Sequence, residues 1–93
     1  MSIANFTENK HVAIAPHNIS SALGTIAPTH FCASIPSFLA LEFHASDVPF
    51  WVDLGDRAPK SVIQNGSVAW PEKPGWGVTL NEKVARRHAL PGA

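Results

Sequence analysis

The chain has 93 residues, of which 45% are hydrophobic and only 15% are charged, whereas soluble domains usually carry about 25% charged residues. Seven basic and seven acidic side chains cancel, so the net charge favours neither nucleic acid nor an anionic membrane as a partner. Because so few charges cover a small protein poorly, part of the surface is expected to be buried against another chain.

The N-terminus and the single cysteine indicate the cellular setting. Residues 1–10 contain no apolar stretch that suits a signal peptide, and no hydrophobic run approaches the ~20 residues of a membrane span. A cytoplasmic protein is therefore expected. Cys32 is the only cysteine, which excludes an internal disulfide, and its apolar neighbours favour a buried, unreactive thiol.

The first 34 residues predict a helix, a strand and a second helix. Residues 2–10 indicate the tail of a helix, and residues 11–16 form a short apolar run typical of a strand covered on both faces. Ser20 and Ser21 are candidate N-caps of the next helix. Pro28 disfavours an undisturbed helix there and predicts a kink or a late start.

A second strand and a hairpin are expected after this helix. Residues 38–43 predict a strand parallel to the first, so that the two strands and the helix between them form one unit. Residues 61–64 and 67–70 predict a small hairpin around a type I′ turn at Asn65–Gly66.

The remaining segments predict loops and one more helix. Residues 47–51 indicate an ordered loop held by aromatic packing, residues 55–60 a polar turn, and residues 71–77 a rigid loop rich in proline and glycine. Asn81 is expected to cap a short C-terminal helix that continues to Arg87.

Two ionisable side chains stand at the ends of the predicted strands. His17 follows the first strand and Glu42 lies at the end of the second. Parallel strands joined by a helix end on the same side, so the two groups are expected to face one cleft and to suit proton transfer. On these residues alone, a hydrogen-bonded structural His17 and a solvent-facing Glu42 are the simpler alternatives.

Three neighbours are weaker candidates for substrate binding. Asn18 fits the strand-to-helix turn better than a substrate contact, because its side chain can hydrogen-bond nearby backbone. His44 and Asp47 are possible residues of the rim of the predicted cleft.

No metal site is predicted for the chain alone. His30 and Cys32 form the only close pair of possible ligands, and they would not share one face of a helix.

Several short segments, taken in order, resemble the end of the barrel domain of the enolase superfamily. The closest resemblance is to mandelate racemase-like acid-sugar dehydratases of the gluconate or galactonate type, and it covers roughly residues 8 to 92. The segments similar to the last barrel strands are residues 15–18, 23–25, 30–36 and 39–44, and those similar to the family's C-terminal tail are residues 47–51, 65–66, 71–75 and 77–82.

The resemblance implies roles for the site residues. His17 matches the position of a general acid/base at the end of the seventh barrel strand. Glu42 matches an acidic residue that hydrogen-bonds the substrate's carboxylate or the developing enolate. Asn18 and His44, which lie beside these two residues in the sequence, are the candidate substrate-binding residues. Such enzymes abstract a proton next to a carboxylate, and a divalent metal, usually magnesium (Mg2+), stabilises the enolate. The resemblance places the metal ligands on earlier strands that this sequence lacks.

The expected fold is therefore α/β, the terminal strand–helix–strand portion of a (β/α)-barrel followed by a small hairpin and a short helix. Residues 1–46 would supply the last two strands and their helix, and residues 47–93 a tail that packs on the capping domain. A complete barrel needs about 250 residues, so this chain would encode little more than its last quarter.

Three functions remain open. The first is the C-terminal part of a magnesium-dependent acid-sugar dehydratase that is inactive alone and binds a sugar acid only in the complete enzyme. The second is a non-catalytic module that associates with itself or with a partner chain carrying the missing strands, because unpaired strands leave exposed edges. A vestigial reading frame without a role is the third.

Overall fold

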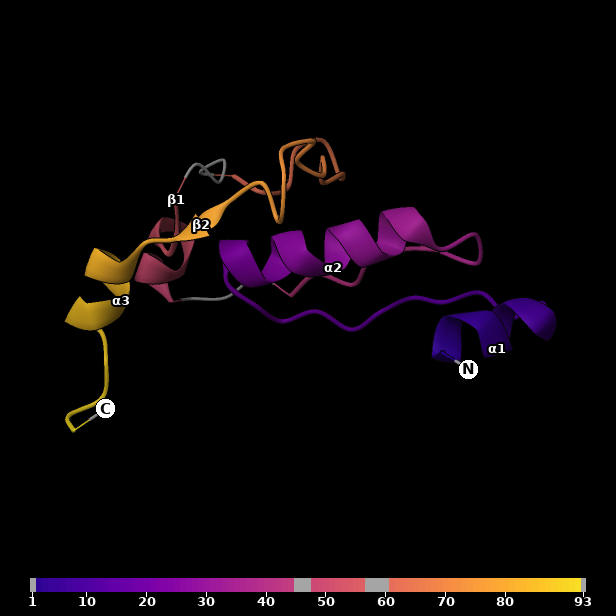
Figure 1. The fold of residues 1–93 in the computed structure, drawn as a ribbon, viewed down its shortest axis with the longest axis horizontal. Coiled ribbons are helices and arrows are strands. Elements are labelled where there is room, and N and C mark those ends of the chain that lie inside the picture. Colours follow the sequence, from indigo (N-terminus) through magenta and orange to yellow (C-terminus); the bar gives the residue numbers. More distant parts are fainter. Residues whose placement is uncertain (1, 45–47, 57–60, 93) are drawn as a thin grey trace.

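The computed structural model describes residues 2–44, 48–56 and 61–92. Within these described ranges, three helices, one short 3-10 helix and two very short strands follow one another (Figure 1). In chain order they are α1 (Ile3–Asn9), α2 (Ala22–Ser34), η1 (Pro49–Asp53), β1 (Gly55–Asp56), β2 (Thr79–Leu80) and α3 (Glu82–Arg87). The fold is therefore mixed, with far more helix and irregular chain than sheet.

Helix α2 is the longest element and begins where a good N-cap stands. The Ser21 hydroxyl accepts a hydrogen bond from the Gly24 N–H at 3.2 Å, as predicted for a capping serine. The helix nevertheless runs through Pro28, so the predicted late start is wrong. A buried face that includes Thr25 and Ile26 supplies packing that outweighs the hydrogen bond lost at the proline.

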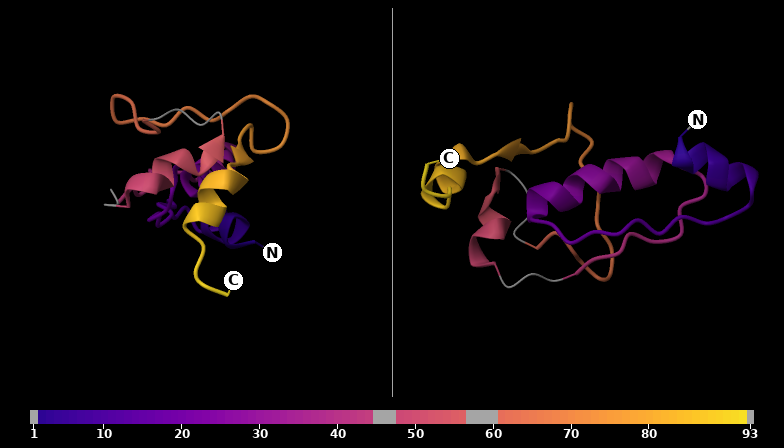
Figure 2. Two further views of the ribbon diagram at one scale, coloured as in Figure 1. Left: turned by 90° about the vertical axis from the view of Figure 1, so that its left-hand side faces the viewer. Right: turned by 90° about the horizontal axis from the view of Figure 1, so that it is seen from below.

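The extended segments before and after α2 run side by side along it (Figures 1 and 2). Ile14 and Phe38 form one parallel bridge, and four backbone hydrogen bonds join residues 14–18 to residues 37–44. The predicted strands at 11–16 and 38–43 are thus reduced to a single bridge. Pro16 lacks a backbone donor, and neither segment pairs with a further strand among the described residues, so no continuous ladder develops.

The predicted hairpin is also reduced to its turn. Asn65 and Gly66 have positive φ values of 50° and 74°, as a type I′ turn requires. Gln64 and Ser67 exchange two backbone hydrogen bonds, but no strand extends from this bridge. The one sheet in the described parts of the chain joins β1 to β2, antiparallel, which the sequence analysis did not predict.

The C-terminal elements gather at one end of α2 (Figure 1). The Asn81 side chain accepts from the Val84 N–H at 3.3 Å, so the predicted cap of α3 is confirmed. The rings of Phe50 and His88 stack with centroids 3.8 Å apart, which holds α3 against η1. The predicted loop at 47–51 contains the start of η1, and Asp47 itself lies outside the described residues.

The molecule is elongated and its core is small. Its extents are 46 × 31 × 27 Å, and its radius of gyration is 15.0 Å, against about 12 Å for a compact domain of this length. The accessible surface is 6886 Å², against about 5,200 Å² for a folded monomer of this mass. The buried hydrophobic residues are Ala4, Ala22, Ile26, Cys32 and Val78.

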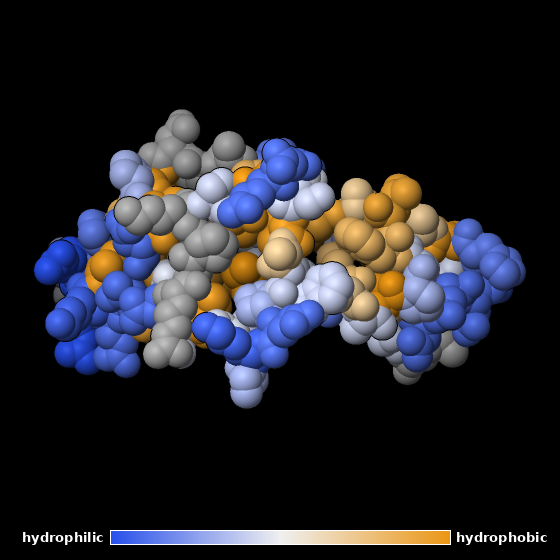
Figure 3. Space-filling model, turned by 90° about the horizontal axis from the view of Figure 1, so that it is seen from above, coloured by the Kyte–Doolittle hydropathy of each residue, from blue (hydrophilic) through white to orange (hydrophobic). Residues whose placement is uncertain are grey.

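Because the core is small, many hydrophobic side chains remain exposed to solvent. Figure 3 shows a contiguous group of them on one face, in the half of the molecule that carries α1. Val12 and Leu39, one in each paired segment, are both exposed, so the predicted cover on both faces of the first strand is absent. No helix in the described ranges is both long and apolar enough to cross a membrane.

Candidate active site

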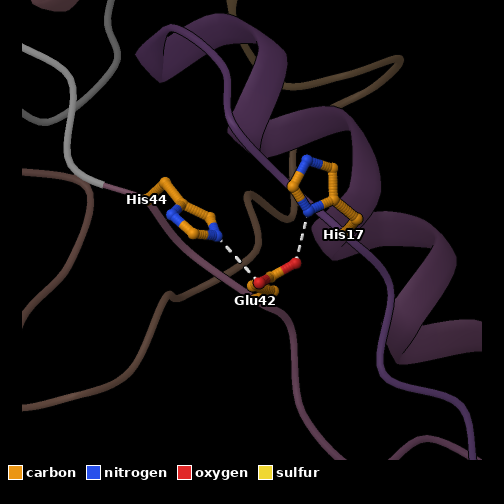
Figure 4. A group of neighbouring side chains, drawn as sticks. All are labelled: His17, Glu42 and His44. Carbon is orange, nitrogen blue, oxygen red and sulfur yellow. Dashed lines mark hydrogen bonds and ion pairs between the residues drawn. The ribbon is translucent and has the colours of Figure 1, made fainter.

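Two backbone hydrogen bonds place the site residues on one side of the paired segments. The Glu42 N–H donates to the Pro16 carbonyl at 3.0 Å, and the His44 N–H donates to the Asn18 carbonyl at 3.2 Å. These bonds set Glu42 and His44 opposite His17, and alternate residues of an extended chain project to the same side. The three side chains therefore converge, as Figure 4 shows.

Glu42 lies between two imidazole rings. Its Oε2 is hydrogen-bonded to Nδ1 of His17, and its Oε1 lies 2.8 Å from Nε2 of His44. The two rings are tilted toward each other, with centroids 5.5 Å apart. Each carboxylate oxygen thus has its own histidine, and the three residues form one hydrogen-bonded chain.

The two histidines lower the pKa of Glu42. The larger cause is the hydrogen bond from His44, and the hydrogen bond from His17 adds to it. Glu42 is therefore an ionised carboxylate at neutral pH. Because a carboxylate only accepts hydrogen bonds, both facing ring nitrogens must carry the proton. In a neutral His17 ring, Nε2 then keeps its lone pair and faces away from Glu42.

This arrangement can take up a proton at an open surface. The side chains of His17, His44 and Glu42 are 67%, 50% and 45% exposed, respectively. A carboxylate that fixes the tautomer of a histidine is a common way to prepare a general base. The residues described do not exclude water from the three side chains, so the site lacks the dry surroundings that strengthen electrostatic catalysis.

Asn18 is placed away from this group. Its side chain is buried and donates from Nδ2 to the Thr25 hydroxyl at 3.3 Å, which ties the extended segment to α2. Successive residues of an extended chain point to opposite sides, so His17 faces solvent while Asn18 faces the helix. This placement agrees with the structural role that the sequence favoured for Asn18, and its predicted substrate contact stays a prediction.

His44 holds a more central place than the sequence analysis gave it. It was a rim candidate, yet it contacts Glu42 directly and completes a group of three possible metal ligands whose donor atoms all lie within 4.8 Å of one another. The signal was the spacing of two residues, which puts Glu42 and His44 on the same side of an extended segment. Helical spacing does not reveal this pair, because residues two apart do not face each other on a helix.

Magnesium does not suit this group. Mg2+ prefers oxygen ligands in octahedral geometry, whereas His17 and His44 offer two imidazole nitrogens beside one carboxylate. No other group of three close histidine, cysteine or acidic side chains occurs in the described part of the chain. The described residues therefore offer no group of three such side chains that suits Mg2+.

Comparison with known proteins gives one consistent result. Residues 1–84 match the family model described as Enolase C-terminal domain-like. The chain is 39% identical over 90 residues to D-xylonate dehydratase from Haloferax volcanii, a match that covers 97% of this chain and 21% of that enzyme.

A solved structure agrees with this assignment. The mandelate racemase/muconate lactonizing enzyme-like protein from Rubrobacter xylanophilus superposes with a TM-score of 0.82 and 41% identity, over 97% of this chain and 23% of that protein. The chain thus spans less than a quarter of the length of these relatives. His17 and Glu42 meet across two parallel segments, and the family model matches residues 1–84. The chain therefore belongs to the Enolase C-terminal domain-like family.

Proposed function

We propose that this chain is the C-terminal part of a metal-dependent acid-sugar dehydratase and that it contributes to catalysis only within a complete barrel. The observation that carries this proposal is the contact between His17 and Glu42, from two parallel segments, in a chain that is 39% identical to a D-xylonate dehydratase. The substrate class would be a sugar acid, by analogy with that relative.

His17 is proposed as the general acid/base. Because Nδ1 is hydrogen-bonded to Glu42, Nε2 is the ring nitrogen that can accept the proton from the carbon next to the substrate's carboxylate. The same nitrogen can return a proton to the departing hydroxyl, which then leaves as water. Glu42 holds that tautomer in the present arrangement. To hydrogen-bond an oxygen of the substrate's carboxylate or of the enolate directly, as the family resemblance implies, Glu42 would need to be protonated, because an ionised carboxylate only accepts hydrogen bonds.

The missing strands explain why the chain alone is expected to be inactive. In the complete enzyme a bound divalent metal, Mg2+ by family resemblance, would supply the positive charge that stabilises the enolate. The described residues do not suit that ion, so its ligands would come from strands outside this chain. Residues 1–46 would supply the last two barrel strands and their helix, and residues 47–93 the tail that packs on the capping domain.

A grafting experiment tests this proposal. Residues 1–93 replace the matching segment of the Haloferax D-xylonate dehydratase. The rate at which the chimera dehydrates D-xylonate is then measured with Mg2+ present. The chimera is expected to be active. His17→Gln in the graft should lower kcat by roughly 10²–10⁴-fold, the usual contribution of a general acid/base.

Two controls make the result interpretable. His30→Gln in the same graft removes a histidine that instead contacts the Trp76 carbonyl and should leave kcat within a few-fold. The isolated chain should show no turnover of sugar acids with Mg2+. Sustained turnover by the isolated chain, or a fully active His17→Gln chimera, would refute the proposed role.

A non-catalytic module that associates with a partner is the second candidate. The excess of accessible surface, and exposed hydrophobic residues such as Val12 and Leu39 on the paired segments, favour it. Both candidates require the same surface to be covered, by the rest of the barrel in one case and by a separate chain in the other. They differ in whether His17 affects activity once that surface is covered.

A further inference from the structure

We infer that His17, Glu42 and His44 form a binding site for a transition-metal dication of the zinc type, separate from any magnesium site of a complete barrel. This site goes beyond the proposed function, because it needs only residues of this chain. Two imidazole nitrogens and one carboxylate oxygen are a donor set that zinc accepts in proteins, with water at the fourth position.

The donor atoms lie close enough to reach one ion. Zinc holds nitrogen and oxygen ligands at 2.0–2.2 Å, so two ligands in a tetrahedron are about 3.4 Å apart. The three donor atoms here all lie within 4.8 Å of one another. Side-chain rotations that bring the donor atoms closer by about an ångström or a little more would close this difference. Such rotations of exposed side chains need no change in the backbone.

The backbone already holds the ligands in register. The bonds from the Glu42 and His44 N–H groups to residues 16 and 18 join the two segments on either side of His17. His17 would bind through Nδ1 and His44 through Nε2, the nitrogens that now face Glu42, after the proton of each ring has moved to its other nitrogen. The ion would replace the two hydrogen bonds to the carboxylate rather than require new neighbours.

The donor types select the metal. Imidazole nitrogen suits zinc, cobalt, nickel and copper, whereas calcium and magnesium prefer oxygen. The high exposure of all three side chains predicts modest affinity, because water competes at an open site. The chain is therefore expected to bind one Zn2+ with a dissociation constant in the micromolar range and to discriminate against Mg2+.

Calorimetric titration of the tag-free, chelator-treated chain with Zn2+ alone tests the site. One equivalent is expected to bind, and Co2+ should give the visible absorption bands of a four- or five-coordinate ion. His44→Ala, His17→Ala and Glu42→Gln should each weaken binding by about 10–100-fold, at least the cost of losing an outer partner of a metal ligand. All three residues are exposed, and circular dichroism verifies that each variant keeps its helices.

The matched control removes a histidine outside the group. His11 is exposed and has φ of +54°, a conformation that asparagine tolerates, so His11→Asn should fold and bind Zn2+ as the parent chain does. Absence of a 1:1 complex, or equal weakening by His11→Asn and the three site variants, would overturn the inference. Neither result depends on dehydratase activity, so failure here and failure of the proposed function are distinguishable.

Discussion

At the scale of single residues, Glu42 organises the site. It accepts from two histidines on two segments, and these contacts keep it ionised and fix which nitrogen of each ring carries the proton. Its folded pKa is lowered, so its contribution to stability is present above the ordinary pKa of a glutamate and is lost as the pH falls through the lowered value. Solvent screening keeps that contribution small.

Removal of His44 should raise the pKa of Glu42. The hydrogen bond from His44 is the largest cause of the lowered value and that from His17 the next, so His44→Ala and His17→Ala are each expected to move the carboxyl pKa upward, toward that of an unperturbed glutamate. Carbon-detected NMR titration of the Glu42 carboxyl measures both shifts. An unchanged titration in His44→Ala would mean that the contact does not persist in solution.

The candidate site was predicted from the sequence only in part. His17 and Glu42 could be paired because both stand at the ends of apolar runs joined by one helix, a local pattern that depends on no more distant part of the fold. The contact of His44 with Glu42 depends on side-chain direction along an extended segment. Asn18 follows the same rule with the opposite result, because it points toward α2.

At the scale of elements, helices were predictable and strands were not. The caps of α2 and α3 involve residues three apart in the sequence, so Ser21 and Asn81 identify helix starts without any distant partner. Strand formation instead depends on neighbours. Residues 11–16 and 38–43 have strand-like composition, but without further strands beside them they make only one bridge.

Pro28 predicts that α2 is less stable than it could be. It lies seven positions into the helix and removes one intrahelical hydrogen bond. An interior proline costs about 3 kcal/mol relative to alanine, so Pro28→Ala should raise the free energy of unfolding by up to about that amount. Urea unfolding followed by circular dichroism at 222 nm measures the change.

Pro36→Ala provides the comparison, because Pro36 lies beyond the C-cap residue Ile35 and removes no hydrogen bond of α2. Its effect should be much smaller, since a proline outside the helix mainly restricts the unfolded chain. If Pro28→Ala instead lowers stability, the proline ring must contribute packing that exceeds the gain in helix stability.

At the scale of the whole molecule, the most important feature is an accessible surface that is large for the length of the chain. The accessible area exceeds that of a compact monomer by roughly 1,600 Å², which is about twice the ~800 Å² that one partner buries in a standard protein–protein interface. An apolar hollow of about 510 Å³ lies between α2, residues 38–43 and the Asn65–Gly66 turn. The chain spans less than a quarter of the length of the matched relatives, and the residues described leave these surfaces uncovered.

Self-association of the isolated chain is the expected result of this uncovered surface. Residues 38–43 expose the apolar side chains of Phe38, Leu39 and Phe43 and have backbone pairing on one side, a surface that a second copy can cover. Sedimentation velocity should therefore show a mass that increases with protein concentration. Leu39→Glu places a charge on this stretch and should shift the distribution toward monomer.

Leu90→Glu tests whether position or only added charge matters. Leu39 is 70% exposed and Leu90 is 78% exposed. Leu90, however, follows α3 and is distant in sequence from the paired segments. Association that persists in Leu90→Glu and weakens in Leu39→Glu would locate the contact on the paired segments. A parent chain that stays monomeric at every concentration would contradict this expectation, because the exposed apolar surface would then need no cover. Such a result would also remove the main support for the partner-binding candidate.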